Sequence, residues 1–312
     1  MAEGKLKTGV VKKRASKREK KDWIAAYIFI APVTLGLLVF YIWPFIQNIW
    51  FSFNEVSKFN VATFCGLANY QKLFHDGEVL KTFGNTLKYV VVTVPVGLFL
   101  SILIATLLNS KIKGTSIYRT LYFLPSVTMA AAVAMVWKWI YNEKMGILNS
   151  AIRALGGKGI GWLTDPKIAL YSVMIVGLWM SIGYNMIILL AGMQGISRSY
   201  YEAAQIDGAS HFRILHLVVF PMTKSSFITL GLMSFIASYN NYMCPSLITN
   251  DSDKYMVSQG LRSFFIEGGA YGTEWSLVMA ASAVIVIPLL IMFAFAQKWF
   301  IDGIGGDTGV KG

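Results

Sequence analysis

The sequence has few charged residues and few cysteines, and it lacks a nucleotide-binding loop. Only 14% of its 312 residues are charged, and it contains 2 Cys. Cys65 falls in a predicted loop and Cys244 in a predicted membrane span, so a disulfide between them would have to join different depths. The GxxxxGK[ST] pattern, whose backbone amides hold phosphates, is absent. Any ATP chemistry is therefore expected on another polypeptide.

Catalytic and metal-binding groups are equally scarce, with only 3 His in the chain. His211 and His216 are five residues apart and diverge by about 140° on a helix, so a zinc site with Glu202 is not expected. The predicted spans contain serines but no His or acidic residue that could activate them, which argues against an intramembrane hydrolase. We expect no catalytic, metal-binding or cofactor-binding residue in this chain.

Apolar residues, by contrast, are abundant: they make up 55% of the chain, and the mean hydropathy is +0.54. This is more apolar surface than one soluble core could bury, so a bilayer must cover the remainder. A helix that crosses about 30 Å of hydrocarbon needs roughly 20 apolar residues. Six stretches are long enough and have no charged residue in their central turns: 23–44, 89–108, 118–137, 168–193, 227–248 and 275–296. The sequence predicts an all-α integral membrane protein with six transmembrane helices.

The distribution of Lys and Arg predicts the orientation, because cytoplasmic loops carry the excess of both. Residues 1–22 contain nine of them, and the connections after the second and fourth spans carry three each. The N and C termini are therefore expected in the cytoplasm. The chain divides into a basic tail (1–22), a six-helix transmembrane domain (23–297) and a short C-terminal tail (298–312).

The net charge of +12 also raises the possibility of nucleic-acid binding. The basic tail, however, has no interleaved aromatic residues that could stack on bases. Its position directly before a span is explained by topology and by anionic lipid. We expect a lipid bilayer, and no nucleic acid, as its partner.

Uncharged polar side chains cluster in the second half of the predicted bundle. Such groups are costly in lipid, so they should form hydrogen bonds between helices or line a watery path. Both interpretations stay open, and the candidate path residues are Tyr184, Asn185, Ser238, Tyr239, Asn240 and Asn241. The absence of charge inside the spans favours a neutral, hydroxyl-rich solute.

The run 201–221 is the least lipid-like part of the second half and predicts a helix-turn-helix. Tyr201 and Ala204 share one helical face, Gly208 can end that helix, and Ser210 can cap the next one. The carboxylate of Asp207 can cap the second helix or contact a partner.

This run resembles the EAA loop of the membrane subunits of binding-protein-dependent ABC importers. The family pattern is EAA, three residues, Gly, nine residues, Ile-x-Leu-Pro. Glu202, Ala203, Ala204, Gly208 and Pro221 match it in register, with Val218 in place of Ile and Phe220 in place of Leu. Further runs look like segments of carbohydrate-type ABC permeases. These runs are WPF (43–45), GLANYQKLF (66–74), NTLKY (85–89), YFLPS (122–126), SYNNYMCPSLIT (238–249) and GVKG (309–312).

The resemblance implies an ABC type I importer permease fold in a bacterial-type plasma (inner) membrane. It implies an ATP-driven importer of a sugar, such as a di- or oligosaccharide. It also implies a heterodimer with a second permease subunit, two ATPase subunits that bind ATP and Mg, and an extracytoplasmic sugar-binding protein. The coupling loop, residues 194–224, would dock the ATPase, and its expected functional residues are Tyr201, Glu202, Ala203, Ala204, Asp207, Gly208, Ala209 and Pro221. The alternative is an ion-coupled secondary carrier of a neutral solute.

Overall fold

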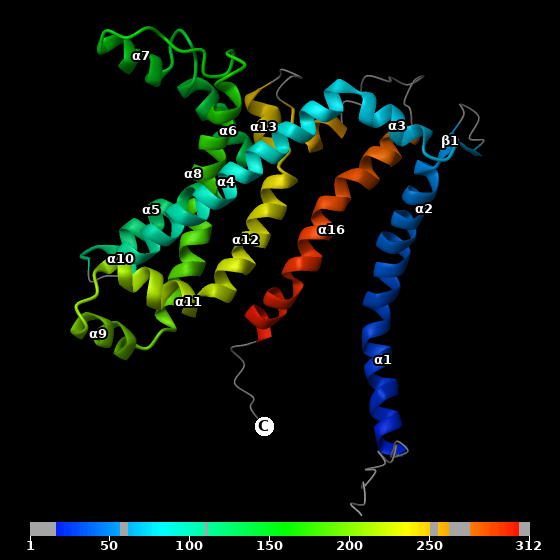
Figure 1. Cartoon of the computed structure of the whole chain (residues 1–312), viewed down its shortest axis with the longest axis horizontal. Coiled ribbons are helices and arrows are strands. Elements are labelled where there is room, and N and C mark those ends of the chain that lie inside the picture. The colour runs from blue at the N-terminus through cyan, green and yellow to red at the C-terminus, as the bar shows by residue number, and fades with distance from the viewer. Residues whose placement is uncertain (1–16, 57–61, 110–111, 250–254, 262–274, 306–312) are drawn as a thin grey trace, which may run out of the picture.

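Helices dominate the computed structural model, which describes residues 17–56, 62–109, 112–249, 255–261 and 275–305 (Figure 1). Four helical stretches are long and apolar enough to cross a membrane, and the count rises to six if each of two bent helix pairs is one span. The all-α membrane fold expected from the sequence is therefore confirmed.

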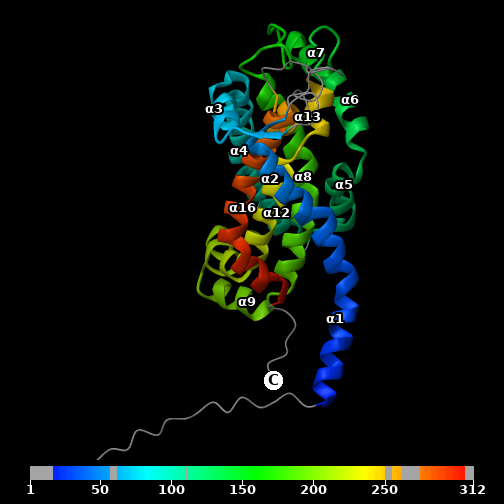
Figure 2. The same ribbon diagram turned by 90° about the vertical axis from the view of Figure 1, so that its right-hand side faces the viewer.

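The first span is longer than predicted, and its first part stands clear of the other helices (Figures 1 and 2). It consists of α1 (Lys17–Leu37), the π-helical η1 (Leu38–Ile42) and α2 (Trp43–Ser52). None of its most apolar window is buried. Only its end, α2, packs extensively on another span, α16 (Trp275–Gly305). From Trp23 onward the exposed side chains of α1 are largely apolar, which is a surface suited to contact with a bilayer or another subunit.

The centre of the bundle is the packing of α4 (Gly77–Asn109) on α8 (Ala169–Gln194). Small residues permit this close approach, as they commonly do between membrane helices. A side chain at Gly177 would overlap the hydroxyl of Tyr89, a residue with only 1% of its surface exposed. A side chain at Gly183 would overlap the backbone of Tyr122. These glycines fix how α4 and the following helix lie against α8.

The third and fifth predicted spans are each divided into two helices. The stretch 118–137 is divided between α5 (Thr115–Val127) and α6 (Ala130–Ile140), which meet at 98°. Thr128 between them is extended, so the helical hydrogen bonds stop there. Apolar composition predicted the length of this stretch but gave no information about the break.

The fifth span is bent before its start and broken near its end. Helix α12 (Lys224–Tyr239) begins beyond a 71° bend that separates Leu215–Met222 from Lys224–Ile248. It stops at Asn240, and α13 (Met243–Ile248) follows after a short irregular segment. The predicted stretch 227–248 therefore contains two helices.

The two ends of the bundle carry different short elements. The α9 end carries the start of α1, the end of α16 and helix α9 (Arg198–Ile206) (Figures 1 and 2). The opposite end, here the α7 end, carries α3, α7 and α13. It also carries an antiparallel hairpin of β1 (Asn54–Val56) and β2 (Ala62–Phe64). Helix α3 comprises Ala68–His75, and helix α7 comprises Ile147–Ala154.

Candidate functional site: the coupling loop

The coupling loop forms the helix-turn-helix that its sequence predicts. Helix α9 ends at Asp207, and Gly208 then adopts φ +70°. The Ala209 amide donates to the Ala204 carbonyl at 2.9 Å, and the Gly208 amide donates to the Gln205 carbonyl at 3.0 Å. This pair of bonds is a Schellman motif, which satisfies two carbonyls at the end of a helix. The turn therefore holds the end of α9 in a fixed direction.

The second arm starts with the expected serine cap. The Arg213 amide donates to Ser210 Oγ at 3.4 Å. The arm continues through α10 (His211–Ile214), the π-helical η2 (Leu215–Val219) and α11 (Phe220–Met222), which has Pro221 in its first turn. The arm ends at the 71° bend before α12. Pro221 suits this place because a helix start does not need its missing amide.

The two faces of α9 differ in what they contact. Tyr201 and Ala204 are half-buried and pack against the apolar cluster that includes Met193 of α8. Glu202 and Ala203 are exposed on the other face, and 86% of the surface of Ile206 is exposed. An apolar side chain this exposed, beside small and acidic residues, gives α9 an outward surface suited to a partner.

A cavity of about 720 Å³ lies between α9 and the ends of α4 and α8. Asn109, Arg198 and Tyr201 are among the residues that line it. The Tyr201 hydroxyl is buried and makes no hydrogen bond with the residues that the structure describes. Burial raises the pKa of Tyr201, and the nearby Asn109 amide opposes this rise. Helix α9 thus rests on the bundle through a narrow apolar contact beside an open space.

Two of the six candidate path residues connect helices by hydrogen bonds. Asn185 Nδ2 of α8 donates to Ser234 Oγ of α12 at 3.2 Å, and only 4% of the surface of Asn185 is exposed. The Tyr239 hydroxyl of α12 donates to the Ile285 carbonyl of α16 at 3.0 Å. Both side chains thus form hydrogen bonds between helices, which is one of the two interpretations that the sequence left open.

The other four candidates are at least partly exposed. Tyr184 has 53% of its surface exposed, Asn240 is exposed, and Ser238 and Asn241 are half-buried. Asn240 lies where α12 stops. Irregular backbone at membrane depth is tolerated where protein buries it or where it lines a watery cavity. A role in the path stays a prediction for these four residues.

Sequence reasoning missed the role of Tyr89, which contacts α8 and the broken fifth span together. Its hydroxyl accepts a hydrogen bond from Asn241 Nδ2 at 3.3 Å, across 152 positions of sequence. It also missed Lys88, whose ammonium lies 5.6 Å from the centre of the Tyr171 ring. Only a knowledge of how α4 packs on α8 could have found either contact.

Comparison with known families decides what kind of protein carries this loop. Residues 72–305 match the family model described as the binding-protein-dependent transport system inner membrane component. The chain belongs to this family. The match extends from α3 to the end of α16 and includes the whole coupling loop. The family resemblance of the EAA run is thereby confirmed, and the chain is a transport permease component of a membrane.

Individual relatives agree with this family. The permease is 29% identical over 285 residues to the probable ABC transporter permease protein YurN of Bacillus subtilis, covering 90% of this chain and 97% of that one. It is 34% identical over 230 residues to the probable ABC transporter permease protein PH1215 of Pyrococcus horikoshii, covering 70% and 78%. The alpha-glucoside transport system permease protein AglF of Rhizobium meliloti is 28% identical over 276 residues, covering 86% and 81%.

A solved structure shows the same fold. A chain of a bacterial alginate ABC transporter, in complex with its alginate pentasaccharide-bound periplasmic protein, superposes with a TM-score of 0.75. The superposition covers 96% of the permease and 100% of that chain, at 20% sequence identity. The permease therefore has an ABC importer permease fold.

Proposed function

We propose that this permease is a membrane-spanning subunit of an ATP-driven, binding-protein-dependent sugar importer. In this proposal, α9 docks an ATPase subunit in the cytoplasm, and closure of the ATPase dimer pushes on α8 and α12. ATP and Mg bind to the ATPase chains. A second permease, in a heterodimer, completes the translocation path.

The observation that carries the proposal is the exposed face of α9 on a fixed turn. Glu202, Ala203 and Ile206 point away from the bundle, while Tyr201 and Ala204 point into it. Ala203 permits close approach of a partner, Ile206 supplies apolar area, and Glu202 can pair with a basic group. A force applied to the exposed face of α9 is transmitted to α4 and α8 through the packing of Tyr201 and Ala204.

The arrangement of the ends supports the orientation. The start of α1, the end of α16 and α9 lie at one end of the bundle (Figures 1 and 2). The excess of Lys and Arg before α1 favours the cytoplasm for that end, in a bacterial-type plasma membrane. The α7 end would then face a sugar-binding protein outside. The exposed apolar face of α1 leaves surface for lipid and for the second permease.

The uncharged interior and the relatives support a sugar as cargo. Tyr184, Ser238, Asn240 and Asn241 offer hydroxyl and amide groups without a net charge, which suits a neutral, hydroxyl-rich solute. One relative is an alpha-glucoside permease, and the similar solved transporter is shown with a pentasaccharide-bound protein. A di- or oligosaccharide fits both.

Sugar uptake by membrane vesicles tests the proposal. The vesicles contain the permease, its second permease and its ATPase, and the binding protein is added outside with radiolabelled sugar. The proposal expects uptake that requires ATP and the ATPase. Uptake that persists without the ATPase and stops when an ion gradient is collapsed would favour the secondary-carrier alternative.

A further inference from the structure

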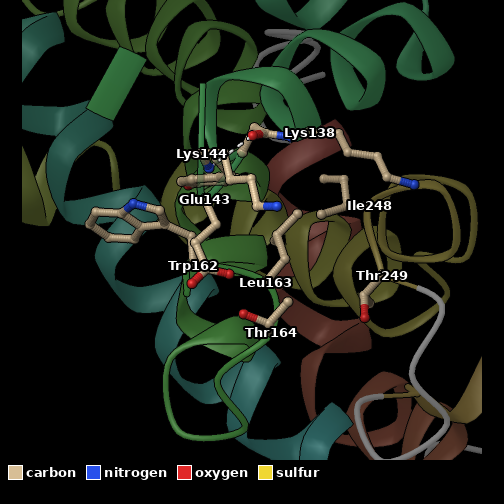
Figure 3. Close-up of a pocket in the computed structure, with 10 residues that line it drawn as sticks. Lys138, Glu143, Lys144, Trp162, Leu163, Thr164, Ile248 and Thr249 are labelled. Atoms are coloured by element: carbon tan, nitrogen blue, oxygen red, sulfur yellow. Dashed lines mark hydrogen bonds between the residues drawn. The ribbon is translucent and has the colours of Figure 1, made fainter. Parts of the chain in front are cut away.

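A second cavity, of about 560 Å³, lies at the α7 end of the bundle, opposite the coupling loop (Figure 3). Its walls come from the end of α6, the turn 141–144, the segment 162–164 and the end of α13. Figure 3 shows the side chains of Lys138 and Lys144 on one side of the cavity and that of Thr164 on the opposite side. The cavity thus has a basic side and a hydroxyl-bearing side.

A buried asparagine holds the walls of this cavity in place. Asn149 has no exposed surface, and its Nδ2 donates to the carbonyls of Glu143 and Ile160 at 3.1 and 2.8 Å. Its Oδ1 accepts from the Ile160 amide at 2.9 Å and from Trp162 Nε1 at 3.1 Å. A side chain with four such bonds fixes three chain segments relative to one another. The cavity is therefore formed before any ligand arrives.

The aromatic groups in the wall are already engaged in packing. Tyr141 has 2% of its surface exposed, its hydroxyl donates to the Ser172 carbonyl at 3.0 Å, and its ring lies 5.8 Å from that of Trp162. The indole N–H of Trp162 donates a hydrogen bond to Asn149 Oδ1. Stacking on a sugar ring needs a free aromatic face, and these two rings pack against each other and against the core. The cavity is thus poorly suited to hold a sugar by stacking.

The charged groups, by contrast, are free to meet a ligand. Lys138 and Lys144 are exposed and form no ion pair with any residue that the structure describes. Glu143 also lines the cavity, which leaves a net charge of about +1 from these three groups. The Arg153 guanidinium donates hydrogen bonds to the carbonyls of Glu143 and Lys144, so a third cationic side chain lies against the turn that forms one wall. The cavity therefore presents two ammonium groups and one carboxylate beside the hydroxyl of Thr164.

We infer that this cavity receives an acidic loop of the extracytoplasmic binding protein when that protein docks. The inference rests on the proposed function, because it needs a binding protein at the α7 end. The cavity volume of about 560 Å³ exceeds a single carboxylate and fits the tip of a loop that carries one or two acidic side chains. Complementary charges of this kind guide association and fix orientation. The two lysines thus help to place the binding protein over the path.

The test uses the complete transporter in lipid vesicles, with saturating sugar, and measures ATPase stimulation as the concentration of binding protein is varied. The double variant Lys138→Glu with Lys144→Glu should raise the half-saturating concentration of binding protein about tenfold at low salt, given about threefold for each exposed pair. The maximal ATPase rate should not change. The difference should shrink at high salt. A matched double variant, Lys158→Glu with Lys167→Glu, reverses two exposed lysines of the same segment outside the cavity.

Each outcome decides the inference. A tenfold rise for the cavity variant and less than a twofold rise for the control supports it, as does recovery when an acidic residue of the binding protein is changed to Lys. Equal effects of both double variants overturn it. A changed half-saturating sugar concentration with unchanged binding-protein dependence overturns it too and assigns the cavity to the sugar. Absence of stimulation in the wild-type complex would instead contradict the proposed function.

Discussion

Replacement of Gly208 tests whether the turn after α9 must hold one backbone geometry. Gly208 has φ +70°, and a Cβ added there would meet nothing within 4 Å. The cost of a side chain is therefore conformational and not steric. The left-handed region costs an L residue about 1–2 kcal/mol, less for Asn and more for a β-branched residue. We expect ATP-driven uptake to decrease in the order wild type, Gly208→Asn, Gly208→Ala, Gly208→Val.

The expected loss of uptake follows from the free-energy cost of the left-handed conformation at position 208. A cost of about 1.4 kcal/mol shifts an equilibrium about tenfold, so Gly208→Val should lower uptake by about tenfold where the intact turn limits coupling. The measurement is sugar uptake in vesicles, with the amount of co-purified ATPase as a second readout. Gly195 provides a matched control in the same loop, because its φ is −72° and a Cβ there is in ordinary contact at 3.4 Å. If Gly208→Val and Gly195→Ala gave the same uptake, the role of the turn would be refuted.

Three further changes test other contacts. Tyr201→Ala should lower sugar uptake per ATP hydrolysed several-fold because its ring joins α9 to the bundle, whereas Tyr200→Ala, at an exposed position, should change it little. Asn149→Ala should destabilise residues 141–168 by about 2–4 kcal/mol through unpaired backbone groups, measured as faster proteolysis of this segment. Gly177→Ala should lower the thermal stability of the purified permease by about 1–3 kcal/mol, since its Cβ overlaps the Tyr89 hydroxyl.

Matched variants separate these effects from general damage. Ser150→Ala changes an exposed neighbour of Asn149 and should leave the rate of proteolysis unchanged. Gly192→Ala places a Cβ on α8 at 3.5 Å from its nearest neighbour, an ordinary contact, and should cost less than about 1 kcal/mol. Equal loss of stability for Gly177→Ala and Gly192→Ala would contradict the proposed packing of α4 on α8.

Local signals in the sequence predicted the parts of the structure that depend on neighbouring residues. Gly208 and Ser210 predicted the turn and the cap because both act within a few positions. The length of the fourth span followed from its apolar run, whereas the helix of the second span begins at Gly77, well before the predicted residue 89. The break after Tyr239 could not be predicted from the sequence, because Asn240 and Asn241 are as compatible with a polar helix face as with a helix end. Hydropathy averages over such a break and does not detect it.

Contacts between distant segments limited what could be predicted about the site. The hydrogen bonds of Asn185 and Tyr239 could not be predicted from the sequence, since each partner lies more than 40 positions away. The basic cavity at the α7 end combines Lys138, at the end of one helix, with Thr249, after another. Neither lysine stood out in the sequence, and only the fold brings them to one cavity.

The central claim is that α9 couples this permease to an ATPase. The most direct measurement is sugar uptake by vesicles that contain the permease pair, with the ATPase present or omitted, while the ion gradient is held constant. We expect that uptake requires the ATPase and ATP, and that Gly208→Val loses most of it. Uptake that continues without the ATPase and stops only when the ion gradient is collapsed would instead identify an ion-coupled carrier and exclude coupling through α9.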